Sequence, residues 1–168
     1  MTKDTLESFS NKINSKFLFD YDLKKSNWFN IGGKAKGYFK PDTLDDLVLF
    51  LKKFGEKERV FVLGAGSNIL MTDKKFDGVV IKLGRNFSNL SLLPNKIIVA
   101  GSSVTDKKLS EFAMDNNIGG FEFLSCIPGT VGGGLRINSG CFGSEFKDIL
   151  VSVQVIDKKG NIQTIPCS

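Results

Sequence analysis

Glycine and small polar residues gather in two short segments of this chain, and their spacing favours binding of a phosphate-bearing ligand. The first segment, residues 63–71, reads Leu-Gly-Ala-Gly-Ser-Asn-Ile-Leu-Met and follows an apolar run expected to form a strand. Successive backbone N–H groups in such a tight loop can form a nest for an anion, and Ser67 and Asn68 add side-chain donors. The segment predicts a pyrophosphate site; the alternative is a plain strand–turn–strand corner.

The second segment, residues 122–145, holds six glycines around one proline and is otherwise mostly apolar. Because glycine alone permits very close approach to the backbone, this composition indicates that something bulky lies against the main chain. The alternative is tight packing of a helix on a sheet. Pro128 fits the first turn of a short helix, which would give residues 127–133 free N–H groups for a phosphate or a polar ring edge. Together the two segments predict a large, flat, diphosphate-bearing cofactor between two lobes.

A nucleotide-binding fingerprint of the Gly-x-Gly-x-x-Gly type is excluded in the first segment. Gly64 and Gly66 follow a strand, but Ile69 occupies the place of the third glycine. The residues after it lack helical periodicity, and no acid stands about 20 residues further on to hold a ribose.

Composition narrows the classes of function. A chain of 168 residues forms one domain or two small lobes. The net charge of +5 includes only three arginines, at positions 59, 85 and 136, so we expect no nucleic-acid partner. Histidine is absent, which excludes histidine metal sites, Ser-His or Cys-His catalysis, and a flavin tethered through an imidazole.

Cysteine usage and hydropathy point to a cytoplasmic protein. Cys126, Cys141 and Cys167 have no metal-type spacing, so no metal site is expected, and their odd number argues against a disulfide framework. No apolar run reaches membrane-spanning length, and the polar start is unlike a secretory signal. We therefore expect no membrane partner.

Periodicity predicts two loosely repeated strand–helix–strand units. Residues 4–18 carry a nearly helical apolar stripe. A helix is predicted over 43–54, with Asp42 or Thr43 as its cap and acids in its first turn, and a second helix over 105–116, with Leu109, Phe112 and Ala113 facing inward. Strands are predicted over 37–41, 59–63, 78–83, 96–100, 150–156 and 161–165.

Four motifs, in order, resemble the UDP-N-acetylenolpyruvoylglucosamine reductases, also called UDP-N-acetylmuramate dehydrogenases or MurB. Asn27-Trp-Phe-Asn-Ile-Gly-Gly33 is similar to the family's Asn-Thr-Phe-x-Ile-Gly-Gly, and Leu63-Gly-Ala-Gly-Ser-Asn-Ile-Leu70 to its Leu-Gly-x-Gly-Ser-Asn-Leu-Leu. Residues 76–81 follow at the usual distance. Residues 120–133 and 138–145 resemble Gly-x-Glu-Phe-x-x-Gly-Ile-Pro-Gly and Asn-Ala-Gly-Ala-Tyr-Gly-x-Glu. Small departures occur at Cys126, Ser139, Cys141 and Phe142.

The resemblance implies an α+β, PCMH-type (vanillyl-alcohol-oxidase-like) FAD-binding fold of two α/β lobes. The apolar stripe predicts a helical segment over 1–19, and the resemblance implies an FAD-binding domain over 20–168, with lobe one at about 20–84 and lobe two at about 85–168. FAD would be bound non-covalently and reduced by NADPH. The implied FAD pyrophosphate contacts are Leu63, Gly64, Ala65, Gly66, Ser67, Asn68, Ile69, Leu70 and Met71. The implied flavin-lining residues are Ile127, Pro128, Gly129, Thr130, Gly132, Gly133, Asn138 and Gly140.

The implied reaction reduces UDP-N-acetylglucosamine-enolpyruvate to UDP-N-acetylmuramate for peptidoglycan. Family members continue into a substrate domain that supplies a proton-donating serine, a glutamate and an arginine, and this sequence stops at Ser168 before them. We therefore expect no catalytic residue here, no turnover by this chain alone, and a UDP-sugar site or a separately encoded C-terminal fragment as partner. Two alternatives stay open: another PCMH-type flavoprotein oxidoreductase subunit, and a non-catalytic remnant.

Overall fold

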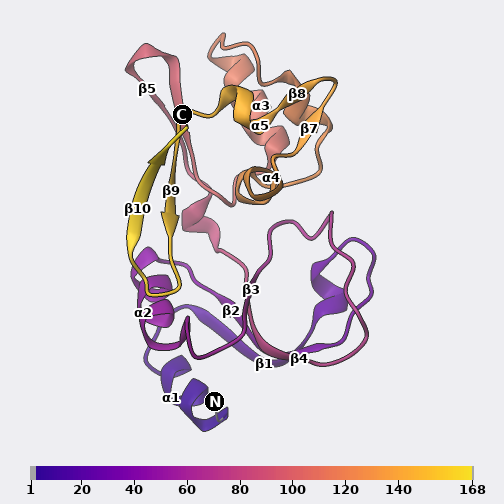
Figure 1. The fold of residues 1–168 in the computed structure, drawn as a ribbon, viewed down its shortest axis with the longest axis vertical. Coiled ribbons are helices and arrows are strands. Elements are labelled where there is room, and N and C mark those ends of the chain that lie inside the picture. Colours follow the sequence, from indigo (N-terminus) through magenta and orange to yellow (C-terminus); the bar gives the residue numbers. More distant parts are fainter. Residues whose placement is uncertain (1–2, 168) are drawn as a thin grey trace.

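Residues 3–167, which the computed structural model describes, form two α/β lobes stacked along the long axis of the molecule (Figure 1). Lobe one contains a four-stranded sheet with the strand order β1-β2-β4-β3. β1 runs antiparallel to β2, whereas β2 and β3 both run parallel to β4. The strands are β1 (Lys16–Asp22), β2 (Lys34–Lys40), β3 (Val60–Val62) and β4 (Phe76–Ile81).

The two faces of this sheet have different covers. Side chains alternate along a strand, so Phe39 and Ile81 point to one face and Tyr38 and Val80 to the other. Two helices, α1 (Lys3–Ser10) and α2 (Leu44–Phe54), bury the first face with a phenylalanine-rich core. Leu63, at the start of the predicted pyrophosphate loop, packs on the second face. The predicted pyrophosphate loop therefore begins on the face of the sheet opposite α1 and α2.

Lobe two is built around short helices. Its buried core consists of Val104, Leu109, Phe123, Leu124 and Phe146. The elements are β5 (Leu90–Leu93), β6 (Ile97–Ala100), α3 (Asp106–Asp115), the 3₁₀ helix η4 (Glu122–Cys126), α4 (Val131–Ile137), β7 (Gly140–Cys141), β8 (Ser144–Glu145) and α5 (Phe146–Ile149). Three further 3₁₀ turns are η1 (Leu23–Ser26), η2 (Arg85–Phe87) and η3 (Pro94–Lys96).

A hairpin of β9 (Ser152–Ile156) and β10 (Ile162–Pro166) runs from lobe two back to lobe one (Figure 1). Its tip lies on α2: a Cβ added at Gly160 would lie 2.8 Å from Lys52 Cγ, and Lys159 pairs with Glu56 at 3.7 Å. Ile156 packs against the core of lobe one. The hairpin thus ties the two lobes together.

Both predicted helices are confirmed as α2 and α3, and a threonine caps each of them. Thr43 Oγ1 accepts a hydrogen bond from Asp46 N at 3.1 Å, and Thr105 Oγ1 accepts one from Lys108 N at 3.3 Å. Each side chain satisfies one N–H group that a helix start leaves without a partner. No helix that the structure describes combines the length and the apolar character needed to cross a membrane.

The helical prediction for residues 1–19 is wrong beyond Ser10. α1 ends there, and β1 begins at Lys16, so the predicted boundary at 19/20 falls inside a strand. Phe17 and Phe19 both pack on the core under α2, while Leu18 between them packs on the opposite face. This alternation has the period of a strand, and it competes with the four-residue spacing that suggested a helix.

Candidate functional site

The loop of residues 64–71 has unused backbone donors. No N–H group from Gly64 to Met71 donates a hydrogen bond to any other residue between 3 and 167. Directly before the loop, Leu63 N donates to Ile81 O at 2.8 Å, so the regular pairing stops where the glycines begin. A row of free main-chain donors in a glycine turn suits an anion with several oxygens.

Gly66 is fixed by the chain beneath it. Its φ of +76° is one that residues other than glycine rarely adopt, and an added Cβ would overlap the carbonyl oxygen of Ser26. Its own carbonyl accepts a hydrogen bond from Trp28 N at 3.0 Å. The backbone of residues 26–28, at the start of the predicted motif of 27–33, therefore supports the loop.

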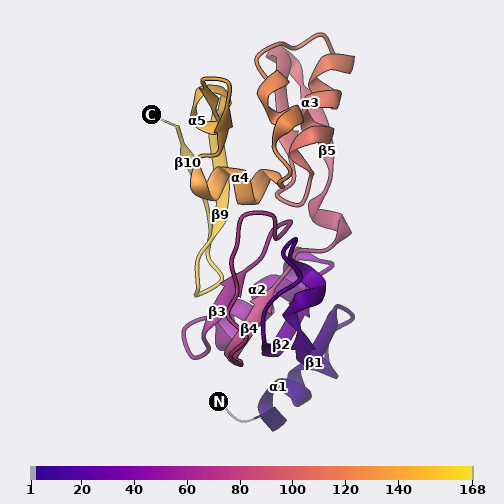
Figure 2. The ribbon, with the colours of Figure 1, turned by 90° about the vertical axis from the view of Figure 1, so that its right-hand side faces the viewer.

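The two glycine segments meet in space. A Cβ added at Gly64 would lie 2.8 Å from Thr130 Oγ1 and 3.7 Å from Gly133 Cα. Figure 2 shows the loop between β3 and β4 rising to the underside of α4. Residues more than 60 positions apart in the sequence are thus brought into contact where the two lobes meet.

The start of α4 differs from its prediction. Pro128 does not lie in the first helical turn, because the helix begins at Val131 with Thr130 as its N-cap. The N–H groups of Val131 and Gly132 donate to Val104 O and Ser102 O, both at 2.9 Å. They are not free for a ligand, since the turn before the helix docks on the segment leading into α3.

The donors of Ile127 and Gly129 are also engaged, with Leu124 O at 3.1 Å and Ile127 O at 2.9 Å. Within the described chain, Thr130 and Gly133 are the residues of this segment whose N–H groups have no partner. Both lie against Gly64. Of the N–H donors predicted in residues 127–133, only those of Thr130 and Gly133, next to the first loop, remain free within the described chain.

Asn138 and Gly140 lie at the other end of α4. Asn138 caps the helix with a left-handed φ of 48°. Its amide donates to Glu145 Oε2 at 2.9 Å and its oxygen accepts from Lys147 N at 3.0 Å. Helical rise puts this residue about 10 Å along the axis from Val131. The structure brings Gly64, Thr130 and Gly133 together, and it places Asn138 in a separate polar cluster.

Asp106 is a buried acid beside the site that sequence reasoning missed. Its side chain is fully buried, and neither carboxylate oxygen has a hydrogen-bond partner in the described chain. Its N–H group donates to Gly129 O at 3.3 Å, and a Cβ added at Gly129 would overlap its Oδ2. Burial without compensating bonds raises the pKa of this carboxyl from 3.8 to about 6. An acid in the first turn of a helix is common, so the sequence carried no signal of its burial.

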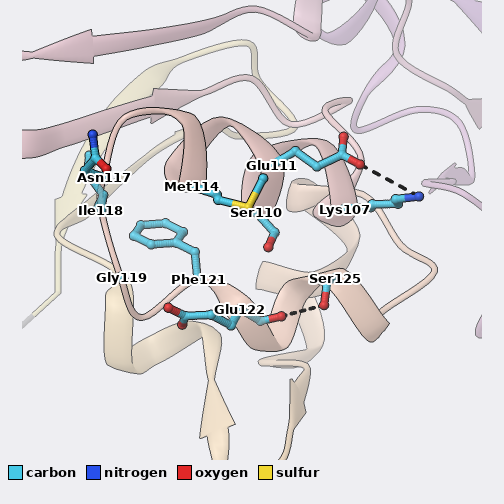
Figure 3. Close-up of a pocket in the computed structure, with 10 residues that line it drawn as sticks. All are labelled: Lys107, Ser110, Glu111, Met114, Asn117, Ile118, Gly119, Phe121, Glu122 and Ser125. Atoms are coloured by element: carbon cyan, nitrogen blue, oxygen red, sulfur yellow. Dashed lines mark hydrogen bonds and ion pairs between the residues drawn. The ribbon is translucent and has the colours of Figure 1, made fainter.

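A hollow of about 440 Å³ lies elsewhere on lobe two, between α3 and η4 (Figure 3). Met114 and Phe121 form its apolar part, and Lys107 pairs with Glu111 at 3.7 Å on its rim. None of the predicted cofactor residues lines it. The hollow is therefore distinct from the place where the glycine loops meet.

Comparison with known sequences agrees with the motif resemblance. Residues 35–166 match the family model described as FAD binding domain. Over its whole length the chain is 68% identical to UDP-N-acetylenolpyruvoylglucosamine reductase of Pelagibacter ubique (strain HTCC1062) and covers 56% of that protein. Over 152 residues, 90% of this chain, it is 47% identical to the protein of the same name from Rickettsia akari (strain Hartford) and covers 51% of it. The chain spans about half the length of these curated relatives.

Solved structures confirm the predicted fold class. UDP-N-acetylenolpyruvylglucosamine reductase (MurB) from Thermus caldophilus superposes with a TM-score of 0.76 at 25% identity, over 92% of this chain and 53% of that one. Berberine bridge enzyme from Eschscholzia californica superposes with a TM-score of 0.65 at 14% identity, over 97% of this chain and 37% of that one. The second likeness concerns the fold alone.

Proposed function

We propose that this chain binds FAD non-covalently across its two glycine segments, as part of a UDP-N-acetylenolpyruvoylglucosamine reductase. The chain belongs to the FAD binding domain family, which supports this proposal. Bound FAD would supply hydride transfer, with NADPH as the source and the enol ether of UDP-N-acetylglucosamine-enolpyruvate as the acceptor. The product, UDP-N-acetylmuramate, would serve peptidoglycan synthesis in the cytoplasm.

One observation carries this proposal: Gly64 lies directly against Thr130 and Gly133, next to a loop whose N–H groups have no partner in the described chain. A side chain at Gly64 would press on Thr130 Oγ1, and one at Gly66 would overlap the backbone of Ser26. The residues therefore fit a flat ligand that carries a diphosphate. The N–H groups of 64–68 would hold the pyrophosphate, and the glycines of 129–133 would leave room for the ring system.

The share of this chain in the reaction is binding and orientation of FAD. The family resemblance assigns proton donation and substrate binding to residues that have no counterpart among the 168 here. We propose that turnover requires those residues on a further stretch of polypeptide, which would also bind the UDP-sugar.

Titration with FAD tests the binding step. We expect the apo chain to bind FAD with a Kd in the micromolar range or below, measured by quenching of flavin fluorescence and by calorimetry. At a hundredfold excess over Kd, FAD should raise the free energy of unfolding by about 2.7 kcal/mol. A chain that unfolds at the same denaturant concentration with and without FAD, and that leaves flavin fluorescence unchanged, would contradict the proposal.

Turnover tests the division of roles. The FAD-loaded chain alone should oxidise NADPH at a negligible rate when UDP-N-acetylglucosamine-enolpyruvate is added. Mixing it with the remainder of the Pelagibacter ubique relative should raise that rate. Full turnover by the chain alone would overturn the assignment of roles, and rapid reoxidation of the reduced flavin by oxygen would favour an oxidase of the same fold.

The contact between the two glycine segments should appear as coupling between two substitutions. Gly64→Ala would press a Cβ against Thr130 Oγ1, and we expect FAD affinity to fall about fivefold, roughly 1 kcal/mol. Thr130→Ala removes that oxygen, so the double variant should bind FAD more tightly than Gly64→Ala alone. Strictly additive losses in a double-mutant cycle would mean that the two loops do not touch in solution.

A further inference from the structure

Two neighbouring aromatic side chains are exposed in the segment whose backbone bonds to the loop of residues 64–71. Trp28 is 61% exposed and Phe29 58%. Neither ring packs against another aromatic ring within residues 3–167. A tryptophan offers a wide, rigid surface that costs little conformational entropy to order against a ligand. Trp28 is also the single tryptophan of the chain, so its fluorescence reports on one place.

The backbone that carries Trp28 is held in place. Its N–H group donates to Gly66 O at 3.0 Å, which joins it to the predicted pyrophosphate loop. The preceding residue, Asn27, is buried, and its amide donates to Leu23 O at 2.8 Å and Ile31 O at 2.7 Å. The indole is therefore presented from a fixed support next to the loop.

The loop has two different flanks. At Gly64 it meets Thr130 and Gly133 of lobe two, and at Gly66 it meets residues 26–28 of lobe one. FAD has a pyrophosphate at its centre and a ring system at each end. If the pyrophosphate lies on the loop and the isoalloxazine ring lies toward the glycines of lobe two, the adenosine half would extend past Gly66 to lobe one, where Trp28 is exposed.

We infer that Trp28 is the stacking surface for the adenine of FAD and so selects FAD over flavins that lack an adenosine. This inference rests on the proposed FAD binding and deepens it. Stacking on an aromatic side chain contributes to the binding of a base, so loss of the indole should weaken adenine-dependent binding by about tenfold or more. FMN shares the isoalloxazine ring and one phosphate but has no adenine, and its affinity should not depend on Trp28.

The experiment compares FAD, FMN and ADP on the wild-type chain and on Trp28→Ala, Trp28→Phe and Phe29→Ala. We expect Trp28→Ala to raise the Kd for FAD and ADP about tenfold and to change the Kd for FMN less than twofold. Trp28→Phe should keep most of the affinity, because a phenyl ring still stacks. Phe29→Ala, a matched loss of an equally exposed neighbour, should leave all three constants unchanged. ADP, which carries no flavin, should quench the fluorescence of Trp28.

Each outcome separates this inference from the proposed function. A wild-type chain that binds no FAD contradicts the proposed function itself. A chain that binds FAD but shows no preference over FMN overturns the adenine assignment. Equal losses of affinity for FAD and FMN in Trp28→Ala would place the indole at the flavin end of the ligand. A loss of affinity in Phe29→Ala but not in Trp28→Ala would show that Phe29, and not Trp28, stacks on the adenine. Unfolding midpoints of all variants check that the fold is kept.

Discussion

Replacing Gly66 by alanine is expected to abolish FAD binding at micromolar concentrations. At a φ of +76° an alanine is strained by about 1–2 kcal/mol. The added Cβ would also overlap Ser26 O and lie 2.9 Å from Asn27 Cα, both parts of the backbone, which cannot rotate away. The loop would have to move and break its hydrogen bond with Trp28 N. We expect the Kd for FAD to rise more than about a hundredfold, close to 3 kcal/mol.

Gly120→Ala is the matched control for this prediction. Gly120 has a similar left-handed φ of +90°, but no heavy atom lies within 4 Å of a Cβ added there. It carries the same conformational strain without the clash and lies outside both glycine segments. FAD affinities measured by calorimetry should therefore stay near the wild-type value for Gly120→Ala. If Gly66→Ala binds FAD as tightly as Gly120→Ala, the loop does not hold the ligand in the way we propose.

The elements that the sequence predicts well are those with a local cause. α2 and α3 each have a threonine cap and one apolar face, and both appear within one residue of the expected bounds. Local propensity and tertiary packing agree in these two helices, so the sequence alone suffices there. The glycine loop of 64–71 also lies where the sequence predicts it, directly after β3, but Gly66 is fixed by contacts with the distant residues Ser26, Asn27 and Trp28.

The features that could not be predicted depend on contacts between distant segments. β1 exists because Phe17 and Phe19 pack on a core that α2 completes. α4 starts later than predicted, and the N–H groups of Val131 and Gly132 donate to the chain before α3, so they are not free for a ligand. Hydrogen bonds between distant segments thus decide which candidate N–H donors remain free. The spacing of residues in the sequence cannot predict these bonds.

Asp106 gives the second large prediction: Asp106→Asn should gain stability over the wild type as pH rises from about 4 to about 7. The unfolded chain releases the proton of Asp106 near 3.8, whereas the folded chain holds it up to about 6. Between these values the folded state binds more protons than the unfolded state, so the wild type loses stability as pH rises. At about 1.36 kcal/mol for each pKa unit, the whole loss from well below pH 3.8 to well above pH 6 is about 3 kcal/mol, and about 2 kcal/mol of it falls between pH 4 and pH 7. The neutral asparagine does not titrate and avoids it.

Urea unfolding of both proteins across this pH range measures the effect as a difference, so the titration of all other groups cancels. The stability of Asp106→Asn minus that of the wild type should increase by about 2 kcal/mol between about pH 4 and pH 7, with most of the change below pH 6. Asp115→Asn, at the exposed far end of α3, controls for the removal of one negative charge from the same helix. A difference that stays flat with pH would mean that the Asp106 carboxylate is compensated in solution. In that case this acid would not be the uncompensated buried charge that the geometry beside Gly129 indicates.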